Sequence, residues 1–133
     1  MNGANSAMPG TRSEEPDELA IIVERSRARF LDRLSLFVDE TDQLLVEGDL
    51  QGEIRDALGK IAFDVHKIAG VAATVGFVEI GKNAAALEQD IKNYLNDPPQ
   101  PEAELKLREK IETFLGQVDS VHQSQTQANG GGI

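Results

Sequence analysis

The chain has 133 residues, no cysteine and a formal net charge of −10. This length fits one domain, and the lack of cysteine excludes disulfides, thiolate metal sites and a thiol nucleophile. The excess of carboxylates argues against binding to nucleic acid, whose phosphates require clustered Lys and Arg. We therefore expect protein partners, and we expect the acidic charge to keep the domain in solution.

Residues 1–16 are polar and rich in Gly, Pro, Ser and Glu, and they predict a flexible N-terminal tail. They lack the basic and then apolar order of a secretory signal. No apolar run in the chain approaches the length of a membrane span, so no membrane association is expected. The expected location is the cytoplasm.

From residue 17 to residue 122, apolar residues recur at steps of three and four without the sustained alternation of a strand, which predicts an all-α domain. The first helix is expected to end near Glu47, because Gly48-Asp49 follows as a stop signal. It begins at Asp17 or is preceded by a separate short helix over 19–23. The apolar stripe of this first helix consists of Val23, Phe30, Leu34, Phe37 and Leu44.

Three further helices show the same spacing. Their apolar positions span 54–75, 80–94 and 107–121. Gly76 ends the second helix, and the segment 96–101 ends the third because residues before proline are steered away from helical geometry. Pro101 suits the first turn of the last helix. Residues 123–133 have nothing to bury and predict a disordered C-terminal tail.

Short connections near Gly48, Gly76 and Pro98 make consecutive helices antiparallel neighbours. The sequence therefore predicts an up-down-up-down four-helix bundle over 17–122. The residues expected in its shared core are Ile61, Val65, Ile68, Leu87, Ile91, Ile111 and Phe114.

His66 follows the core position Val65, so its imidazole should project from the edge of the buried stripe and be partly exposed. The residues on the same helical face are all small: Ala62, Ala69, Gly70 and Ala73. A glycine inside a helix costs about 1 kcal/mol relative to alanine. Gly70 therefore suggests that a partner surface approaches the imidazole closely.

The third helix carries a flanking row beside its own core stripe, formed by Gly81, Ala85, Glu88 and Lys92. We expect Gly81 and Ala85 to belong to the same approach face. His66 lies about 15 Å before Gly76 along its helix, and Glu88 lies about 18 Å after it, less what the turn consumes. The two side chains should therefore stand at nearly the same level on adjacent helices.

At that level, the Glu88 carboxylate could accept a hydrogen bond from Nδ1–H of His66 and leave the Nε2 lone pair outward as a nucleophile. Lys92, one turn beyond Glu88, could then contact phosphoryl oxygens, and Lys67 is a second candidate through its long stem. Each feature also has an ordinary explanation. Histidines at a helix edge and charged surface residues often only contact solvent, and small residues beside a core stripe often only allow close helix packing.

Other chemistries find little support in the sequence. The two histidines have no third ligand at suitable spacing, which argues against a metal site, and His122 near the end of the last helix is expected to be exposed. We see no serine, histidine and acid arrangement and no phosphate-cradling glycine loop. An autonomous enzyme is therefore not expected.

The segment 66–77, HKIAGVAATVGF, is similar to the signature of histidine phosphotransfer (HPt) domains. It has a histidine, an aliphatic residue two positions on, glycine at the fourth position after the histidine, small residues, and then Gly-Phe. The resemblance extends more loosely over residues 25–120. It implies a four-helix bundle whose histidine is phosphorylated on Nε2 and passes the phosphoryl group on in a phosphorelay.

The resemblance also implies residue roles and partners. Glu88 matches the Glu or Gln that orients the imidazole, and Lys92 matches a basic residue that is sometimes present one turn later. Ala69 departs from the pattern, because many members carry a lysine there that helps to neutralise the phosphoryl group. The implied partners are a response-regulator receiver domain, which holds the phosphorylated Asp and Mg²⁺, and a hybrid histidine kinase. We expect a monomer that binds no cofactor itself.

The alternative function is a pure interaction bundle: a helical adaptor, or a degenerate HPt-like protein that binds a receiver domain without exchanging phosphate. Loss of the histidine would have favoured this alternative. His66, Gly70 and Glu88 are all present, so the sequence favours phosphotransfer.

Overall fold

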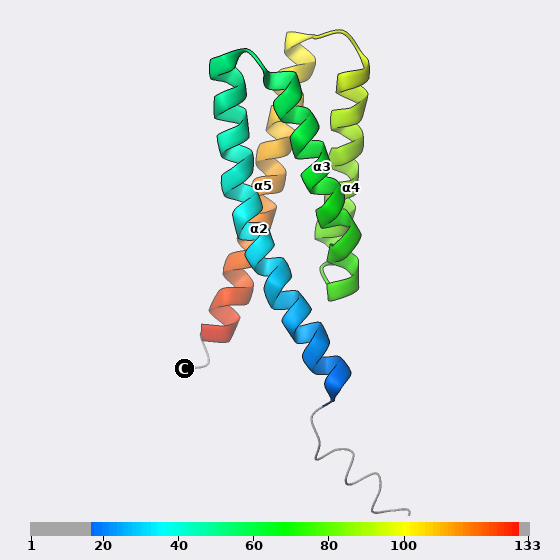
Figure 1. Cartoon of the computed structure of the whole chain (residues 1–133), viewed down its shortest axis with the longest axis vertical. Helices are drawn as coiled ribbons and strands as arrows, with labels where there is room; N and C mark the ends of the chain where they lie inside the picture. The colour runs from blue at the N-terminus through cyan, green and yellow to red at the C-terminus, as the bar shows by residue number, and fades with distance from the viewer. Residues whose placement is uncertain (1–16, 131–133) are drawn as a thin grey trace, which may run out of the picture.

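The computed structural model describes residues 17–130, which form four long helices and one short 3-10 helix (Figure 1). These elements are α2 (Glu18–Gln51), α3 (Ile54–Ala72), η1 (Ala73–Val75), α4 (Val78–Asn96) and α5 (Pro101–Gly130). This part of the chain contains no strand, which confirms the predicted all-α class. The predicted N-terminal tail over 1–16 lies outside the described residues.

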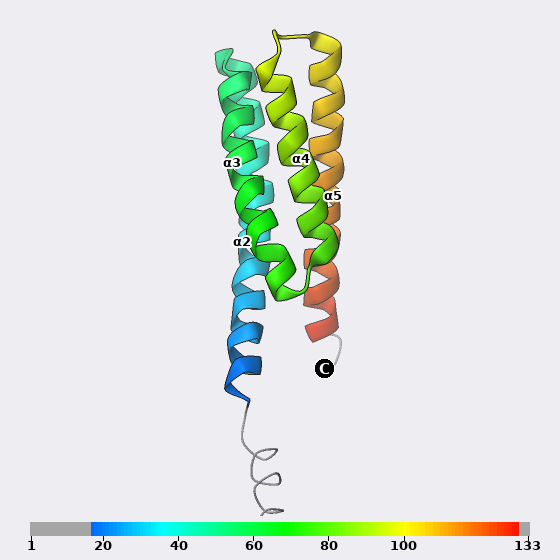
Figure 2. The same ribbon diagram turned by 90° about the vertical axis from the view of Figure 1, so that its right-hand side faces the viewer.

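Consecutive helices run antiparallel, in the predicted up-down-up-down order. The α2–α3 turn and the α4–α5 connection lie at one end of the bundle, and the α3–α4 turn lies toward the other (Figure 1). A second view shows α3 and α4 side by side, with the start of α2 and the end of α5 extending beyond their turn (Figure 2). The helix pair α3–α4 is the most extensive contact of the fold.

The first helix, α2, is continuous from Glu18, so residues 19–23 belong to it and do not form a separate short helix. The Asp17 carboxylate caps its start by accepting a hydrogen bond from the backbone N–H of Leu19 at 3.0 Å. The polar segment 25–29 remains helical because its Arg and Ala residues have high helix propensity.

The predicted end of this helix near Glu47 is wrong, because α2 continues to Gln51. Gly48 lies inside the helix and permits a close approach of α3, since a Cβ there would stand 3.0 Å from the Cβ of Ala57. The chain reverses at Gly52, whose φ of 72° is in the left-handed region that favours glycine. Gly48 is therefore a packing residue, and the stop signal is Gly52.

The second and third helices end as predicted. After Ala72 the helix tightens into η1, and Gly76 ends it with a φ of 94°. The backbone N–H of Phe77 donates to the carbonyl oxygen of Ala72 at 2.8 Å, which closes the turn into α4. α4 stops at Asn96, ahead of the two prolines.

The last helix is longer than predicted. α5 starts at Pro101 and runs to Gly130, so the prediction of a disordered tail is wrong over 123–130. Glutamine and alanine tolerate helical geometry without a core to bury. The guanidinium of Arg27 also donates to Oε1 of Gln125 at 3.3 Å, which links this extension to α2.

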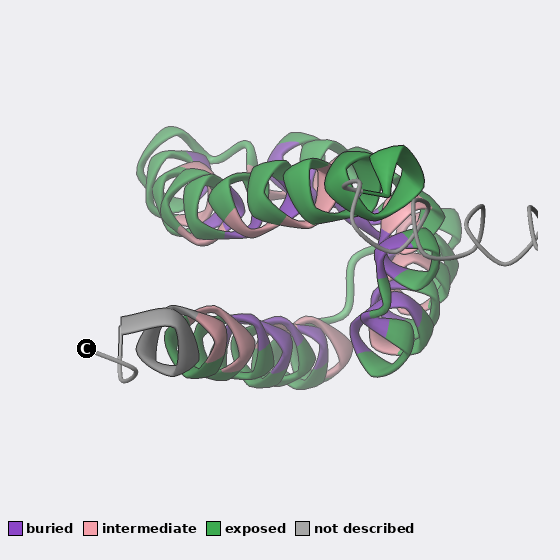
Figure 3. Ribbon diagram, turned by 90° about the horizontal axis from the view of Figure 1, so that it is seen from below, coloured by how far each residue is buried: buried purple, intermediate pink, exposed green. Residues whose placement is uncertain are grey.

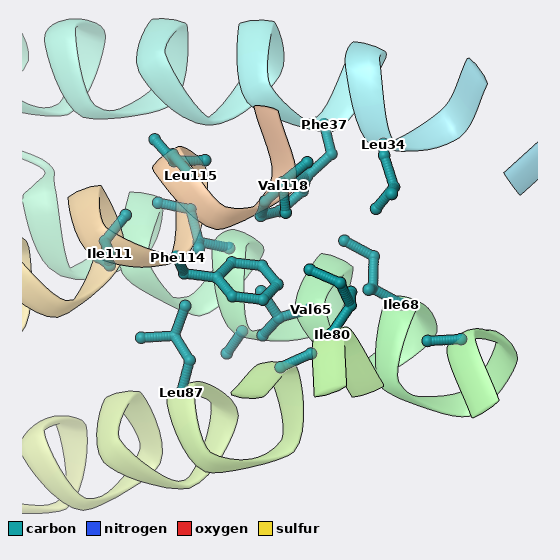
Figure 4. Close-up of a cluster of buried hydrophobic side chains, with 14 of the residues drawn as sticks. Leu34, Phe37, Val65, Ile68, Ile80, Leu87, Ile111, Phe114, Leu115 and Val118 are labelled. Atoms are coloured by element: carbon teal, nitrogen blue, oxygen red, sulfur yellow. The ribbon is translucent and has the colours of Figure 1, made fainter. Parts of the chain in front are cut away.

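The core lies between the four helices, with buried residues on the sides that face one another and exposed residues outside (Figure 3). Side chains from all four long helices converge there (Figure 4). Every residue predicted for the shared core is at most 3% exposed. The alternating four-three spacing thus identified the buried stripe of each helix.

Ile68→Ala should lower the free energy of unfolding by roughly 2 to 5 kcal/mol, because the deletion leaves a cavity in a packed interior. Ile68 is 1% exposed and belongs to the core cluster. Urea denaturation followed by circular dichroism measures the change. The exposed Leu36→Ala on α2 is the control, and a similar loss for both variants would contradict the core assignment.

Candidate functional site

His66 projects outward from α3, and its side chain is 68% exposed. The preceding residue Val65 is fully buried, so the helix turns the next side chain to the edge of the core stripe. The predicted partial exposure is therefore confirmed. Solvent and a partner molecule can both reach the imidazole.

Glu88 on α4 contacts His66 from the adjacent helix. Nδ1 of His66 lies 3.0 Å from both carboxylate oxygens of Glu88, which confirms the predicted contact. A carboxylate can only accept, so Nδ1–H donates this hydrogen bond. In the neutral imidazole the proton on Nδ1 leaves a lone pair on Nε2, the nitrogen that can act as a nucleophile.

Lys92 also binds Glu88. Its Nζ lies 2.8 Å from Oε2 of the carboxylate, one helical turn along α4. The hydrogen bonds from Lys92 and then His66 lower the pKa of Glu88 below its ordinary value, against the opposing effect of burial. Glu88 is therefore ionised near neutral pH. The predicted contact of Lys92 with phosphoryl oxygens stays a prediction, since its ammonium here rests on Glu88.

Lys67 takes a position that the sequence did not indicate. Its Nζ lies 4.3 Å from the centroid of the Phe63 ring, a cation-π contact along the outer face of α3. Lys67 is not among the partners of Glu88, which are His66 and Lys92 in the part of the chain described. Its role at a phosphoryl group likewise stays a prediction.

Four of the predicted small residues leave the face around His66 open. Gly70, Ala73 and Ala85 are exposed, and Ala69 is half-buried. A Cβ at Gly70 would meet nothing within 4 Å, so internal packing of the bundle does not require a glycine there. The absence of a side chain at Gly70 leaves this surface open to a molecule that approaches from outside.

The other two small residues do not belong to this face. Ala62 is 6% exposed, and Gly81 is buried where α4 crosses α3. A Cβ at Gly81 would stand 3.3 Å from the Cβ of Ala72. Both residues are buried inside the bundle, so their predicted place on a partner-binding surface is wrong.

Phe63 is the feature of the site that sequence reasoning missed. It lies one turn before His66 on the outer face of α3 and is 61% exposed. The available signal was a large apolar residue off the core stripe of its helix, three positions before the histidine. An exposed aromatic ring beside an exposed imidazole adds an apolar contact point to the site.

Histidine and carboxylate positions elsewhere do not form a metal site: among residues 17–125, no three His, Asp or Glu side chains are grouped to hold an ion. His122 on α5 is half-buried, so the prediction that it is exposed is wrong. None of the described helices combines the length and the apolar character needed to cross a membrane.

A comparison with known protein families found a match to this chain. A family model described as the Hpt domain matches residues 26–121, a range that contains His66, Glu88 and all four long helices in whole or in part. Searches of curated proteins and of solved structures gave no match.

Glu88→Gln should lower the free energy of unfolding near neutral pH. A carboxyl group whose pKa is lowered on folding stabilises the protein fully above its ordinary value of 4.5, and this contribution disappears as the pH falls through the lowered pKa. The difference between wild type and variant in urea denaturation should therefore shrink below that pH. Glu112→Gln at an exposed position of α5 is the control. A pH-independent difference for Glu88→Gln would contradict the lowered pKa of Glu88.

Proposed function

The chain belongs to the histidine phosphotransfer (Hpt) domain family, and on that premise we propose that His66 carries a phosphoryl group between proteins of a cytoplasmic phosphorelay. Family membership implies involvement in phosphorelay histidine phosphotransfer. The assignment of His66 as the acceptor rests on one observation: an exposed imidazole whose Nδ1 is held by Glu88, with Nε2 left as the free nitrogen.

In the proposed reaction, Nε2 attacks the phosphorus of a phosphorylated Asp on a receiver domain. The N–P bond forms as the P–O bond breaks, and the Asp carboxylate leaves with its electron pair. The proton on Nδ1 stays in place, so the ring gains positive charge as the bond forms. The ionised Glu88 stabilises that charge through the existing hydrogen bond. Transfer to a second receiver domain reverses these steps.

Positioning supplies much of the rate of such a transfer, because the loose transition state requires the oxygen, phosphorus and nitrogen to line up. The orientation of the imidazole by Glu88 supports this role. The open surface at Gly70, Ala73 and Ala85 supports close approach of the partner domain. The chain acts here as a phosphoryl carrier rather than as an autonomous enzyme.

Charge neutralisation is the part of the site that departs from the family pattern, because Ala69 stands where many members have lysine. We assign this role to Lys92 and Lys67, together with the Mg²⁺ of the receiver domain. Lys92 already lies beside Glu88, so a rotation about its side-chain bonds is enough to redirect the ammonium. Lys67 would have to leave the Phe63 ring.

The proposed partners are a hybrid histidine kinase and a response-regulator receiver domain, with this chain acting as a monomer. The exposed small residues Gly70, Ala73 and Ala85 leave room for such a domain to approach the histidine. The acidic net charge of −10 disfavours nucleic acid as a partner.

His66→Gln should abolish labelling when the protein is incubated with radiolabelled ATP, a histidine kinase and a receiver domain. The wild-type label should be acid-labile and base-stable, as expected of a phosphoramidate. His122→Gln is the matched control and should label like wild type. Undiminished label on His66→Gln would mean that another residue accepts the phosphoryl group and would overturn the assignment of His66. A wild-type protein that binds the receiver domain but takes no label would favour the adaptor function instead.

Glu88→Ala should slow transfer from a phosphorylated receiver domain, by roughly 10²-fold if it acts as a typical orienting and charge-stabilising group. Glu88→Gln should have a smaller effect, because its amide oxygen still accepts the bond from Nδ1–H. Single-turnover transfer measures both rates. Asp90→Ala, which removes an α4 carboxylate that binds Lys110 on α5, is the control. A wild-type rate for Glu88→Ala would remove Glu88 from the mechanism.

A further inference from the structure

A groove of about 800 Å³ runs between α2 and α3 on the outer surface of the bundle. Its walls include Glu40, Leu44 and Glu47 from α2 and Asp56, Phe63 and Asp64 from α3. On each helix the lining residues recur at steps of three and four, so the groove follows the two helix axes. Nothing in the phosphotransfer chemistry of His66 requires this groove.

Two apolar side chains line the groove. Leu44 is half-buried on the α2 side, and the exposed ring of Phe63 stands on the α3 side. Gly59 lies one turn before Phe63, and a Cβ there would meet nothing within 4 Å. Because Gly59 has no side chain, the α3 side of the groove leaves room for a side chain of another molecule to reach this apolar surface.

The rim of the groove is acidic. Five of its lining residues are carboxylates: Glu40, Glu47, Glu53, Asp56 and Asp64. None of them forms an ion pair within the residues that the structure describes. The two cations of the lining are Lys60 and Arg55, and the Arg55 guanidinium is directed to the carbonyl oxygens of Leu95 and Asp97. The rim therefore presents a net negative charge that favours a positively charged occupant.

The groove leads to the phosphotransfer site. Phe63 forms part of its wall and precedes His66 by three residues, a rise of about 4.5 Å along α3 with side chains about 60° apart around the helix. A molecule that lies in the groove and covers Phe63 thus reaches the surface next to the imidazole. The groove and the open face at Gly70 adjoin His66 from opposite ends of α3.

We propose that this groove binds a basic amphipathic helix of the protein that exchanges phosphate with His66. A groove between two helices is filled best by a third helix, whose ridges pack between theirs. Aliphatic side chains of that helix cover Phe63 and Leu44, while its Lys and Arg residues face the acidic rim. The inference rests on the proposed function only in assigning the helix to the phosphotransfer partner.

A synthetic helix tests the groove independently of any phosphorylation. The probe is a fluorescent amphipathic peptide of about 18 residues, about 27 Å long as a helix, with Leu on one face and Lys on the other. Fluorescence anisotropy measures its affinity for the full chain. A peptide of the same pattern with Glu in place of Lys should not bind, because the rim would repel it.

Phe63→Ala and Glu47→Lys should each weaken binding of the Lys peptide by roughly tenfold, as expected for the loss of an exposed apolar anchor and for a reversed rim charge. Glu112→Lys makes the same charge change on the exposed face of α5 and should leave the affinity within about twofold. Circular dichroism of each variant checks that the bundle remains folded. No binding of the Lys peptide, equal binding of the Glu peptide, or equal weakening by Glu112→Lys would overturn the proposal.

Two further measurements separate this proposal from the proposed function. His66→Gln should bind the Lys peptide like wild type, although it accepts no phosphate. Phe63→Ala should raise the KM for a phosphorylated receiver domain while leaving the maximal transfer rate nearly unchanged, because Phe63 serves binding and not chemistry. A Phe63→Ala protein with unchanged KM would overturn the assignment of the helix to the phosphotransfer partner.

Discussion

The candidate site depends on one packing constraint, the close antiparallel contact of α3 and α4 on either side of the Gly76 turn. Gly81 removes the side chain that would separate the two helices near this turn, where a Cβ would press on Ala72. The distance along each helix from the turn then fixes which residues stand level. His66 and Glu88 meet at 3.0 Å because this register is fixed by buried residues far more strongly than by their own hydrogen bond.

This division between core and surface separates two tasks within α3. Its inward stripe holds the bundle together, and its outer face carries Phe63, His66 and Gly70, which contribute little to the core. Substitutions on the outer face can therefore change partner contacts with small effects on stability. The same helix presents an apolar and acidic groove before His66 and an open surface after it, so a partner can contact both sides of the imidazole.

Much of this organisation was predictable from the sequence because helical periodicity identifies buried stripes, and distances from a turn identify neighbours. The core residues and the contact between His66 and Glu88 followed from these rules. Gly48 was misjudged as a stop signal because glycine serves both helix ends and close packing, and only the position of Ala57 distinguishes them. Ala62 and Gly81 were misplaced because small residues suit both an open surface and close packing between helices. The groove at Phe63 depends on how α2 and α3 are spaced, which the sequence of either helix alone does not specify.

Lys92 and His66 both bind the Glu88 carboxylate, which has an energetic consequence for a phosphoryl carrier. The Lys92 ammonium already offsets the Glu88 carboxylate, so it can stabilise a phosphoryl group on Nε2 only by giving up this ion pair. With Ala69 in place of a lysine, the cost of that exchange would limit how strongly the chain stabilises such a group. The proposed phosphohistidine would then keep a high group-transfer potential. A relay with nearly level steps is reversible, and its direction follows the relative amounts of phosphorylated donor and free acceptor.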